Sequence, residues 1–306
     1  MKKIWKVLIF ALIVCQMIFS VGCSTVETST EEQGKYIIEA KEAIDLLGQE
    51  GVVLVDMQTP EDYGSGHVNG AVNISRSDIV VDIPVSNMLA PKGQFEKVLG
   101  AKGISNDSTV VIYDNANNMD ASRLWWTLMV YGHENIKVVS GGWKALKEAG
   151  AEITMDATPV AASQYTAKEK NTGMIATIDD VKNQVNDPKK DVILLDTRTQ
   201  EEFDEGTIPG SILFDYIENN YKDGTFKSIQ NVKIQYIEKG MTPDKTIIMY
   251  CKTSMRGAQT YLALYNAGYR NLKLYDGAWV EWSANSSLPV QAPEGNKVES
   301  NQQDNS

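Results

Sequence analysis

One cysteine is followed at short spacing by two cations, in the run Cys251-Lys252-Thr253-Ser254-Met255-Arg256. A cysteine thiolate is a nucleophile, and nearby cations stabilise its negative charge. Residues 247–250 before it form an apolar run, and the residues after it repeat apolar side chains at helical spacing: Ala258, Tyr261, Leu262 and Tyr265. This pattern predicts a buried strand, a tight loop and an amphipathic helix. We therefore expect a thiolate site in which loop N–H groups and the helix N-terminus hold an anion.

The N-terminus has the features of an export signal. Lysines at positions 2, 3 and 6 precede an apolar stretch over residues 7–19, which leads to Ser20-Val21-Gly22-Cys23-Ser24. Small residues directly before a cysteine resemble the lipobox of bacterial lipoproteins, with Ser20 where leucine is most often found. This resemblance implies a lipoprotein signal peptide over residues 1–22, lipid on Cys23, and an extracytoplasmic protein anchored to the bacterial cell membrane. An uncleaved anchor or ordinary signal cleavage nearby are the alternatives.

Length and net charge limit the number of domains and the classes of partner. The 306 residues allow two ordinary domains, and the net charge of −11 argues against nucleic acid as a partner. Residues 23–34 are rich in Ser, Thr, Glu and Gln and predict a flexible tether, whereas residues 290–306 lack an apolar pattern and predict a disordered tail.

Cysteine usage isolates one thiol. The chain has three cysteines: Cys15 lies in the apolar signal segment, Cys23 would carry lipid, and Cys251 remains. A single cysteine in an exported domain forms no internal disulfide, so it is either a reactive thiol or a buried inert one. The neighbouring Lys252 and Arg256 favour the reactive alternative.

The two halves of the chain repeat the same landmarks in the same order, at a nearly constant offset. The matching pairs are Val52–Asp56 with Val192–Asp196, Ser65–Ala71 with Glu205–Ser211, Tyr113-Asp114 with Tyr250-Cys251, and Gly141-Gly142-Trp143 with Gly277-Ala278-Trp279. We infer an α/β protein of two tandem domains, each a mainly parallel sheet flanked by helices.

The boundaries follow from composition and from the repeat. The first copy spans residues 35–151, a polar linker 152–172, and the second copy 173–289. Apolar residues from Tyr36 to Leu47 fall at helical spacing. Asp114 stands where the second copy has Cys251, so the first copy has no thiol nucleophile.

These landmarks resemble the rhodanese family of sulfurtransferases in its tandem form, which has an inactive first domain and a catalytic second one. The markers are Leu195-Asp196-Thr197-Arg198, the two Gly-containing segments 66–71 and 206–211, Tyr250-Cys251 at the start of a loop, and the Gly-x-Trp sequence that closes each copy. The resemblance covers residues 36–288.

The resemblance implies a chemistry. Cys251 takes a sulfane sulfur from a donor such as thiosulfate as a persulfide, and passes it to cyanide or a thiol without a cofactor. A thioredoxin-like reductant is a further possible partner. The residues that would bind substrate are Lys252, Thr253, Ser254, Met255 and Arg256, together with Arg123, which is otherwise a surface helix charge. Asp196 and Arg198 are expected to pair and to support the loop.

The loop itself leaves alternatives open. Ser254 stands where single-domain rhodaneses usually have glycine, so it would adopt a backbone angle that glycine takes easily. Cysteine phosphatases and arsenate reductases use a similar thiolate loop, but with Cys-x5-Arg rather than the Cys-x4-Arg found here. A non-catalytic surface-binding lipoprotein is the other alternative. His67 and His133 are far apart in sequence and have no other ligand at metal-binding spacing, so we expect no metal site.

Overall fold

The computed structural model describes residues 33–292, so the predicted signal peptide, Cys23 and most of the predicted tail lie outside the described residues. The first copy has a five-stranded sheet in the order β1-β8-β7-β2-β4, and the second a five-stranded sheet in the order β10-β14-β13-β11-β12. All neighbouring strands in both sheets are parallel. The structure thus confirms two tandem α/β domains of equivalent topology.

The elements of the first copy are β1 (Ile37–Ile38), α2 (Ala40–Leu46), β2 (Val52–Asp56), α3 (Pro60–Ser65), β3 (His67–Val68), β4 (Val72–Asn73), α4 (Arg76–Ile79), β5 (Val80–Val81), β6 (Met88–Leu89), α5 (Lys92–Ala101), β7 (Thr109–Tyr113), α6 (Met119–Val130), β8 (Ile136–Val139), α7 (Gly142–Glu148) and β9 (Ile153–Thr154). Those of the second copy are η2 (Thr172–Met174), β10 (Ile175–Ala176), α8 (Ile178–Asn186), β11 (Val192–Asp196), α9 (Gln200–Glu205), β12 (Ile212–Leu213), η3 (Tyr216–Asn219), α10 (Ile229–Glu238), β13 (Thr246–Tyr250), α11 (Met255–Asn266), β14 (Leu272–Tyr275) and α12 (Ala278–Ala284).

The central strands coincide with the predicted apolar runs. Residues 247–250 of β13 are buried, as are residues 110–113 of β7. Each of these strands pairs with a parallel neighbour on both sides, which is why the runs are continuous rather than alternating.

The helical spacing from Tyr36 to Leu47 conceals a short strand. The helix α2 begins only at Ala40, and Ile37–Ile38 form the edge strand β1, which pairs with β8. Two residues are too few to show an alternating pattern, so the adjacent helix dominates the periodicity. The second copy repeats this arrangement with β10 and α8.

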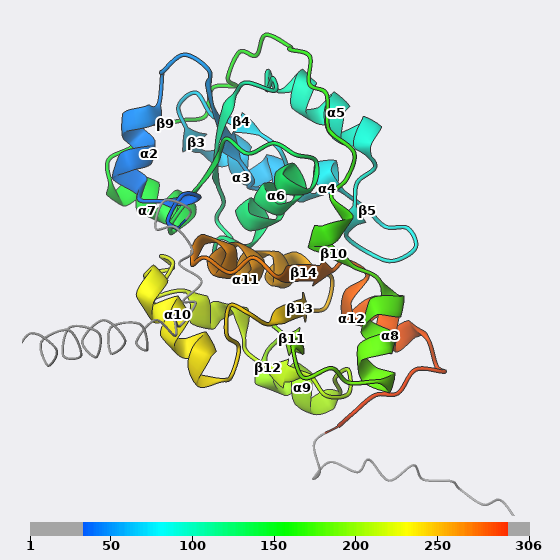
Figure 1. Cartoon of the computed structure of the whole chain (residues 1–306). Coiled ribbons are helices and arrows are strands. Elements are labelled where there is room, and N and C mark those ends of the chain that lie inside the picture. Colours follow the sequence, from blue (N-terminus) through cyan, green and yellow to red (C-terminus); the bar gives the residue numbers. More distant parts are fainter. Residues whose placement is uncertain (1–32, 293–306) are drawn as a thin grey trace, which may run out of the picture. The chain divides into compact units, whose positions relative to one another are not determined.

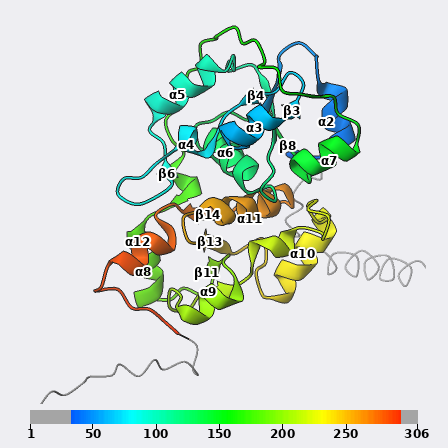
Figure 2. The same cartoon turned by 180° about the vertical axis from the view of Figure 1, so that it is seen from behind.

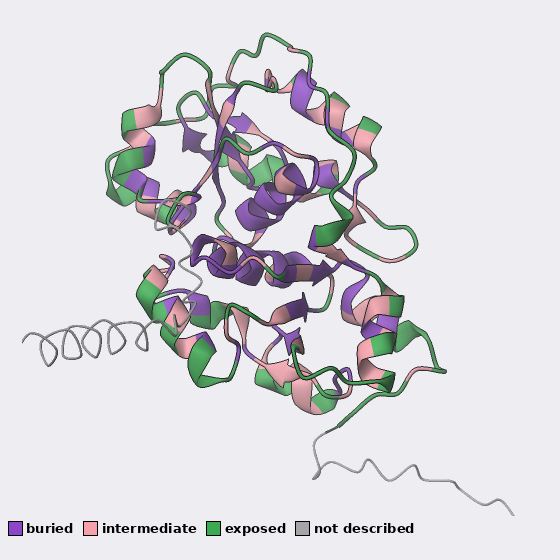
Figure 3. Cartoon of the chain, viewed as in Figure 1, coloured by how far each residue is buried: buried purple, intermediate pink, exposed green. Residues whose placement is uncertain are grey.

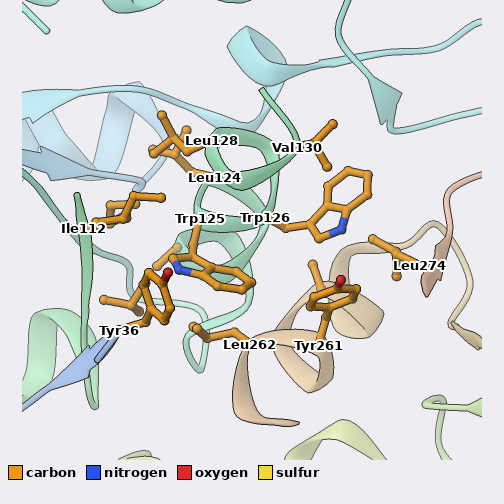
Figure 4. Packing of buried hydrophobic residues seen from close by; sticks show 14 of the residues in the cluster. Tyr36, Ile112, Leu124, Trp125, Trp126, Leu128, Val130, Tyr261, Leu262 and Leu274 are labelled. Atoms are coloured by element: carbon orange, nitrogen blue, oxygen red, sulfur yellow. The ribbon is translucent and has the colours of Figure 1, made fainter. Parts of the chain in front are cut away.

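The two copies meet along α6 and α11, which lie side by side in Figures 1 and 2. Both helices are buried over nearly their whole length, as Figure 3 shows. Trp125 of α6 contacts Tyr261 of α11 with ring centroids 6.1 Å apart, and Trp126 and Leu262 lie in the same cluster (Figure 4). One hydrophobic core therefore spans both copies and fixes which loops of the two copies can meet.

Among residues 33–292, no helix combines the length and the apolar character that a membrane crossing requires.

Candidate active site

Cys251 lies at the carboxyl end of the central strand β13, directly before the loop that opens α11. Its side chain is a free thiol and is buried. The carboxyl ends of parallel strands are where α/β folds place their ligands. The predicted strand, loop and helix around the cysteine are therefore present in the structure.

Two backbone N–H groups near the start of α12 bind the carbonyl groups of Cys251 and Lys252. The N–H of Trp279 donates to the carbonyl of Cys251 at 3.0 Å, and the N–H of Val280 donates to that of Lys252 at 3.2 Å. The N–H groups of Thr253 and Ser254, by contrast, donate no hydrogen bond to any residue in the part of the chain that the structure describes. The carbonyl groups of Cys251 and Lys252 are thus hydrogen-bonded to α12, while the N–H groups of Thr253 and Ser254 remain available to an anion.

Ser254 takes the backbone conformation that glycine adopts easily, with φ of 64°. It is the N-cap residue of α11, and its hydroxyl lies 2.8 Å from the carbonyl oxygen of Tyr275 and 2.7 Å from that of Asp276. The serine thereby ties the loop to the end of β14. Its side chain compensates for the strained angle that glycine would have avoided.

The first copy shows what such a loop holds. Asp114, at the position of Cys251, places one carboxylate oxygen 3.0 Å from the N–H groups of both Ala116 and Asn118, and the other 2.9 Å from that of Ala121. Burial raises the pKa of Asp114 to about 6, although these backbone hydrogen bonds oppose the rise. The loop of the first copy thus binds its own carboxylate through backbone N–H groups.

Arg256 is held by an acidic residue of the second copy. Its Nη1 lies 2.5 Å from Oε2 of Glu202, and its Nη2 lies 2.8 Å from Oε1. This pairing holds the pKa of Glu202 down at about 2. Burial alone would lower the pKa of Arg256, but Glu202 and the Cys251 sulfur together raise it. Glu202 therefore holds the Arg256 guanidinium in one position, from which its positive charge acts on the Cys251 sulfur.

Asp196 and Arg198 form the ion pair that the sequence predicts, with Nη2 of Arg198 2.6 Å from Oδ2 of Asp196. The Arg198 guanidinium also lies over the ring of Trp279, 4.4 Å from its centroid. Since the N–H of Trp279 binds the carbonyl of Cys251, the pair supports the loop through one intermediate residue. Neither Asp196 nor Arg198 takes a position at the sulfur itself.

The comparisons with known proteins agree with this geometry. A family model for the rhodanese-like domain matches the chain twice, over residues 39–149 and 177–285. The chain belongs to the rhodanese-like family.

Relatives of similar length extend this assignment. The rhodanese-like chain is 31% identical over 266 residues to a protein of Saccharopolyspora erythraea named "Putative thiosulfate sulfurtransferase", which covers 81% of this chain and 93% of the relative. It is 29% identical to the sulfur carrier protein TtuD of Thermus thermophilus, over 74% of this chain and 86% of that protein.

Solved structures share the fold. The anaerobic ergothioneine biosynthesis enzyme from Chlorobium limicola superposes with a TM-score of 0.76 at 22% identity, covering 85% of this chain and 71% of that one. Wild-type EanB also gives a TM-score of 0.76 at 22% identity, with 85% and 70% covered. At this identity the likeness extends to the fold alone.

The other predicted site residues of this rhodanese-like protein differ in their exposure. Lys252 is exposed, whereas Met255, the first residue of α11, is buried. Thr253 is partly buried, and its hydroxyl accepts a hydrogen bond from the amide Nδ2 of Asn87 at 2.9 Å. The first copy therefore contacts the loop that follows Cys251 directly, through a residue that the sequence did not indicate.

Arg123 is neither a surface charge nor an exposed substrate cation. It is completely buried, and its Nη2 lies 2.8 Å from Oδ1 of Asp276 in the second copy. The same nitrogen donates to the carbonyl of Asn87 at 2.9 Å, and the guanidinium lies over the ring of Trp126. Arg123 thus links the two copies and positions Asn87 at the loop.

Sequence reasoning missed a second cation of the first copy, whose pKa responds to the charge of Cys251. Arg76 of α4 is paired with Asp120, and this pairing is the largest cause of the raised pKa of Arg76. The negative charge of Asp114 and then that of Cys251 raise this pKa further. Asp120 occupies the second helical position of α6, as Arg256 does in α11. This charge reversal between equivalent positions is visible in the repeat and could have indicated that Asp120 has a basic partner.

A larger hollow than any beside this loop lies near the other ends of the two long helices. It has a volume of about 830 Å³ and is formed near the C-terminal ends of α6 and α11, by residues that include Val130, Tyr261 and Lys168. None of the residues 251–256 lines it. Size alone therefore does not identify the reactive site in this protein.

Proposed function

We propose that the protein is a sulfurtransferase that moves a sulfane sulfur from thiosulfate or a related donor to cyanide or a thiol through a persulfide on Cys251. The observation that carries this proposal is the contrast between the two copies. In the first, backbone N–H groups of the loop bind the carboxylate of Asp114. In the second, the residue at the same strand end is a thiol, and the loop N–H groups of Thr253 and Ser254 donate no hydrogen bond within residues 33–292. The second loop thus has donors for a charged sulfur carried by Cys251.

The chemistry balances without a cofactor. The Cys251 thiolate attacks the outer sulfur of thiosulfate, the sulfur–sulfur bond of the donor breaks, and sulfite leaves with the bonding electrons. The terminal persulfide sulfur then accepts attack by cyanide or a thiolate, which releases thiocyanate or a new persulfide and restores the Cys251 thiolate. Loop N–H groups and the positive charge of Arg256 stabilise the persulfide anion between the two steps.

Mass spectrometry of the intact protein tests the first step. After treatment with thiosulfate, the wild-type chain should gain one sulfur atom, and Cys251→Ala should gain none. Cyanide should then remove the sulfur and release thiocyanate. Parallel assays with mercaptopyruvate and with a chromogenic phosphate ester distinguish the other chemistries. Phosphatase activity in the absence of sulfur transfer would refute the proposal, and absence of any reaction at Cys251 would favour a binding protein.

The setting of this activity is part of the proposal. The basic, apolar and small-residue pattern that ends at Cys23 supports a lipid anchor on an extracytoplasmic protein. A thioredoxin-like protein would supply the thiol that such a compartment otherwise lacks. Metabolic labelling with a fatty acid should mark the wild-type chain and not Cys23→Ala, and the variant should leave the membrane fraction. Labelling of both chains alike would contradict lipidation at this residue.

A further inference from the structure

A hollow of about 470 Å³ lies in the first copy beside the catalytic loop. Its wall includes the charged and polar side chains of Arg76, Asp82, Asn87 and Asp120. One of these residues, Asn87, donates a hydrogen bond to Thr253 two positions after Cys251. Asn87 thus links the hollow to the loop that follows Cys251, although none of the residues 251–256 lines the hollow itself and the first copy has no thiol nucleophile of its own.

Arg76 lines this hollow, and one nitrogen of its guanidinium, Nη1, is available for a ligand. Its Nε and Nη2 donate to the two carboxylate oxygens of Asp120 at 2.7 Å and 2.9 Å, which leaves Nη1 without a hydrogen bond in residues 33–292. The Arg76 side chain is 40% exposed and that of Asp120 is 10% exposed. Asp120 thus fixes the direction of a guanidinium whose free edge can bind a carboxylate.

An acidic group lies on the wall of the same hollow. Asp82 uses one carboxylate oxygen to accept the N–H of Asn87 at 3.1 Å, and its other oxygen has no hydrogen bond within the described residues. A cation and an anion on one wall suit a molecule that carries both charges. The apolar side chains of Met57, Pro60 and Val80 suit the carbon skeleton of such a molecule.

The volume argues against thiosulfate or cyanide as the occupant, since either would leave most of the hollow empty. Building on the sulfurtransferase function proposed above, we infer that this hollow is the acceptor site for an amino-acid or short-peptide thiol, whose carboxylate binds Nη1 of Arg76 and whose ammonium lies by Asp82. Cys251 is also among the charges that raise the pKa of Arg76, after Asp120 and Asp114.

The transfer step follows from this placement. The thiolate of the acceptor attacks the terminal sulfur of the Cys251 persulfide, and the bond between the two persulfide sulfurs breaks. Its electrons return to Cys251 as thiolate, and the acceptor leaves as a persulfide. No oxidant or reductant is consumed.

The test compares cysteine with cysteamine, which lacks the carboxylate but has a thiol that ionises similarly. The full chain is first loaded with sulfur from thiosulfate, and the rate of persulfide discharge is then measured against the concentration of each thiol. Wild type should react with cysteine about tenfold faster than with cysteamine, the factor expected for one charge-assisted contact. Arg76→Gln should bring this ratio close to one, and Arg76→Lys should retain part of it.

Two further variants separate binding from general effects. Asp120→Asn should lower the ratio because the guanidinium loses its anchor. Lys41→Gln removes one positive charge, as Arg76→Gln does, but at an exposed position of α2, and it should keep the wild-type ratio. A wild-type ratio near one, or an unchanged ratio in Arg76→Gln, would overturn the acceptor site while leaving the sulfurtransferase proposal intact. If thiosulfate forms no persulfide on wild type, the sulfurtransferase proposal fails first and the acceptor site with it.

Discussion

Arg123 and Asp276 form a buried ion pair between the two copies, with Nη2 and Oδ1 2.8 Å apart and the side chains 0% and 6% exposed. Asp276 also accepts the N–H of Leu89 at 2.7 Å, so both partners hold the segment around β6. This segment carries Asn87, which contacts the catalytic loop. The pair therefore connects the interface of the two copies to the reactive site.

Removing one partner of this pair should destabilise the protein strongly. Arg123→Met leaves the Asp276 carboxylate buried without its cation, and we expect the free energy of unfolding to fall by about 3–5 kcal/mol. Urea unfolding followed by tryptophan fluorescence measures the change, with Lys41→Gln as the exposed control. A loss below about 1 kcal/mol would show that the pair does not hold the copies together.

Acid should weaken the protein through Glu202. Its folded-state pKa of about 2 lies below the ordinary value of 4.5, chiefly because of the hydrogen bond from Arg256. A lowered pKa contributes stability that is present above pH 4.5 and is lost as the pH falls towards 2. Glu202→Gln should therefore flatten the loss of stability over this interval, as measured by thermal unfolding at a series of pH values. Parallel curves for wild type and variant would contradict this assignment.

Asp114 should have the opposite dependence. Its pKa is raised from 3.8 to about 6 by burial, so the folded state binds its proton more tightly than the unfolded state. The stabilising contribution of the protonated group is present below pH 3.8 and is lost as the pH rises through 6. The stability of wild type relative to Asp114→Asn should thus decline between these values. A difference that rises over the same interval would show that the ionised form is favoured.

Two substitutions of Ser254 separate its backbone strain from its hydrogen bonds. Both Ser254→Ala and Ser254→Gly remove the contacts with the carbonyls of Tyr275 and Asp276, which should cost about 1–3 kcal/mol. Glycine additionally relieves the φ of 64°, so it should be more stable than alanine by about 1 kcal/mol. Denaturant unfolding of the two variants gives the difference directly. Equal stabilities would mean that the positive φ carries no strain here.

The fold was largely predictable because its signals are local. Apolar runs mark β7 and β13, and the duplicated order of landmarks gives two copies of one unit. The short edge strand β1 was not distinguished from the helix that follows it, since two residues carry no period of their own, and its equivalent β10 is just as short. Their identity depends on pairing with β8 and β14, which are distant in sequence.

The site divides in the same way. The sequence by itself singled out Cys251 as the candidate nucleophile, placed Asp114 at the equivalent position of the first copy, and predicted that Asp196 pairs with Arg198, because these follow from residue type and short spacing. Only the tertiary structure decided that Arg123 is buried against Asp276, that Arg256 is held by Glu202, and that Arg76 is paired with Asp120. Each of these outcomes depends on how α6 packs against α11 and which loops are thereby brought together. The packing of these helices determines which side chains distant in sequence become neighbours, and a local sequence pattern carries no information about such contacts.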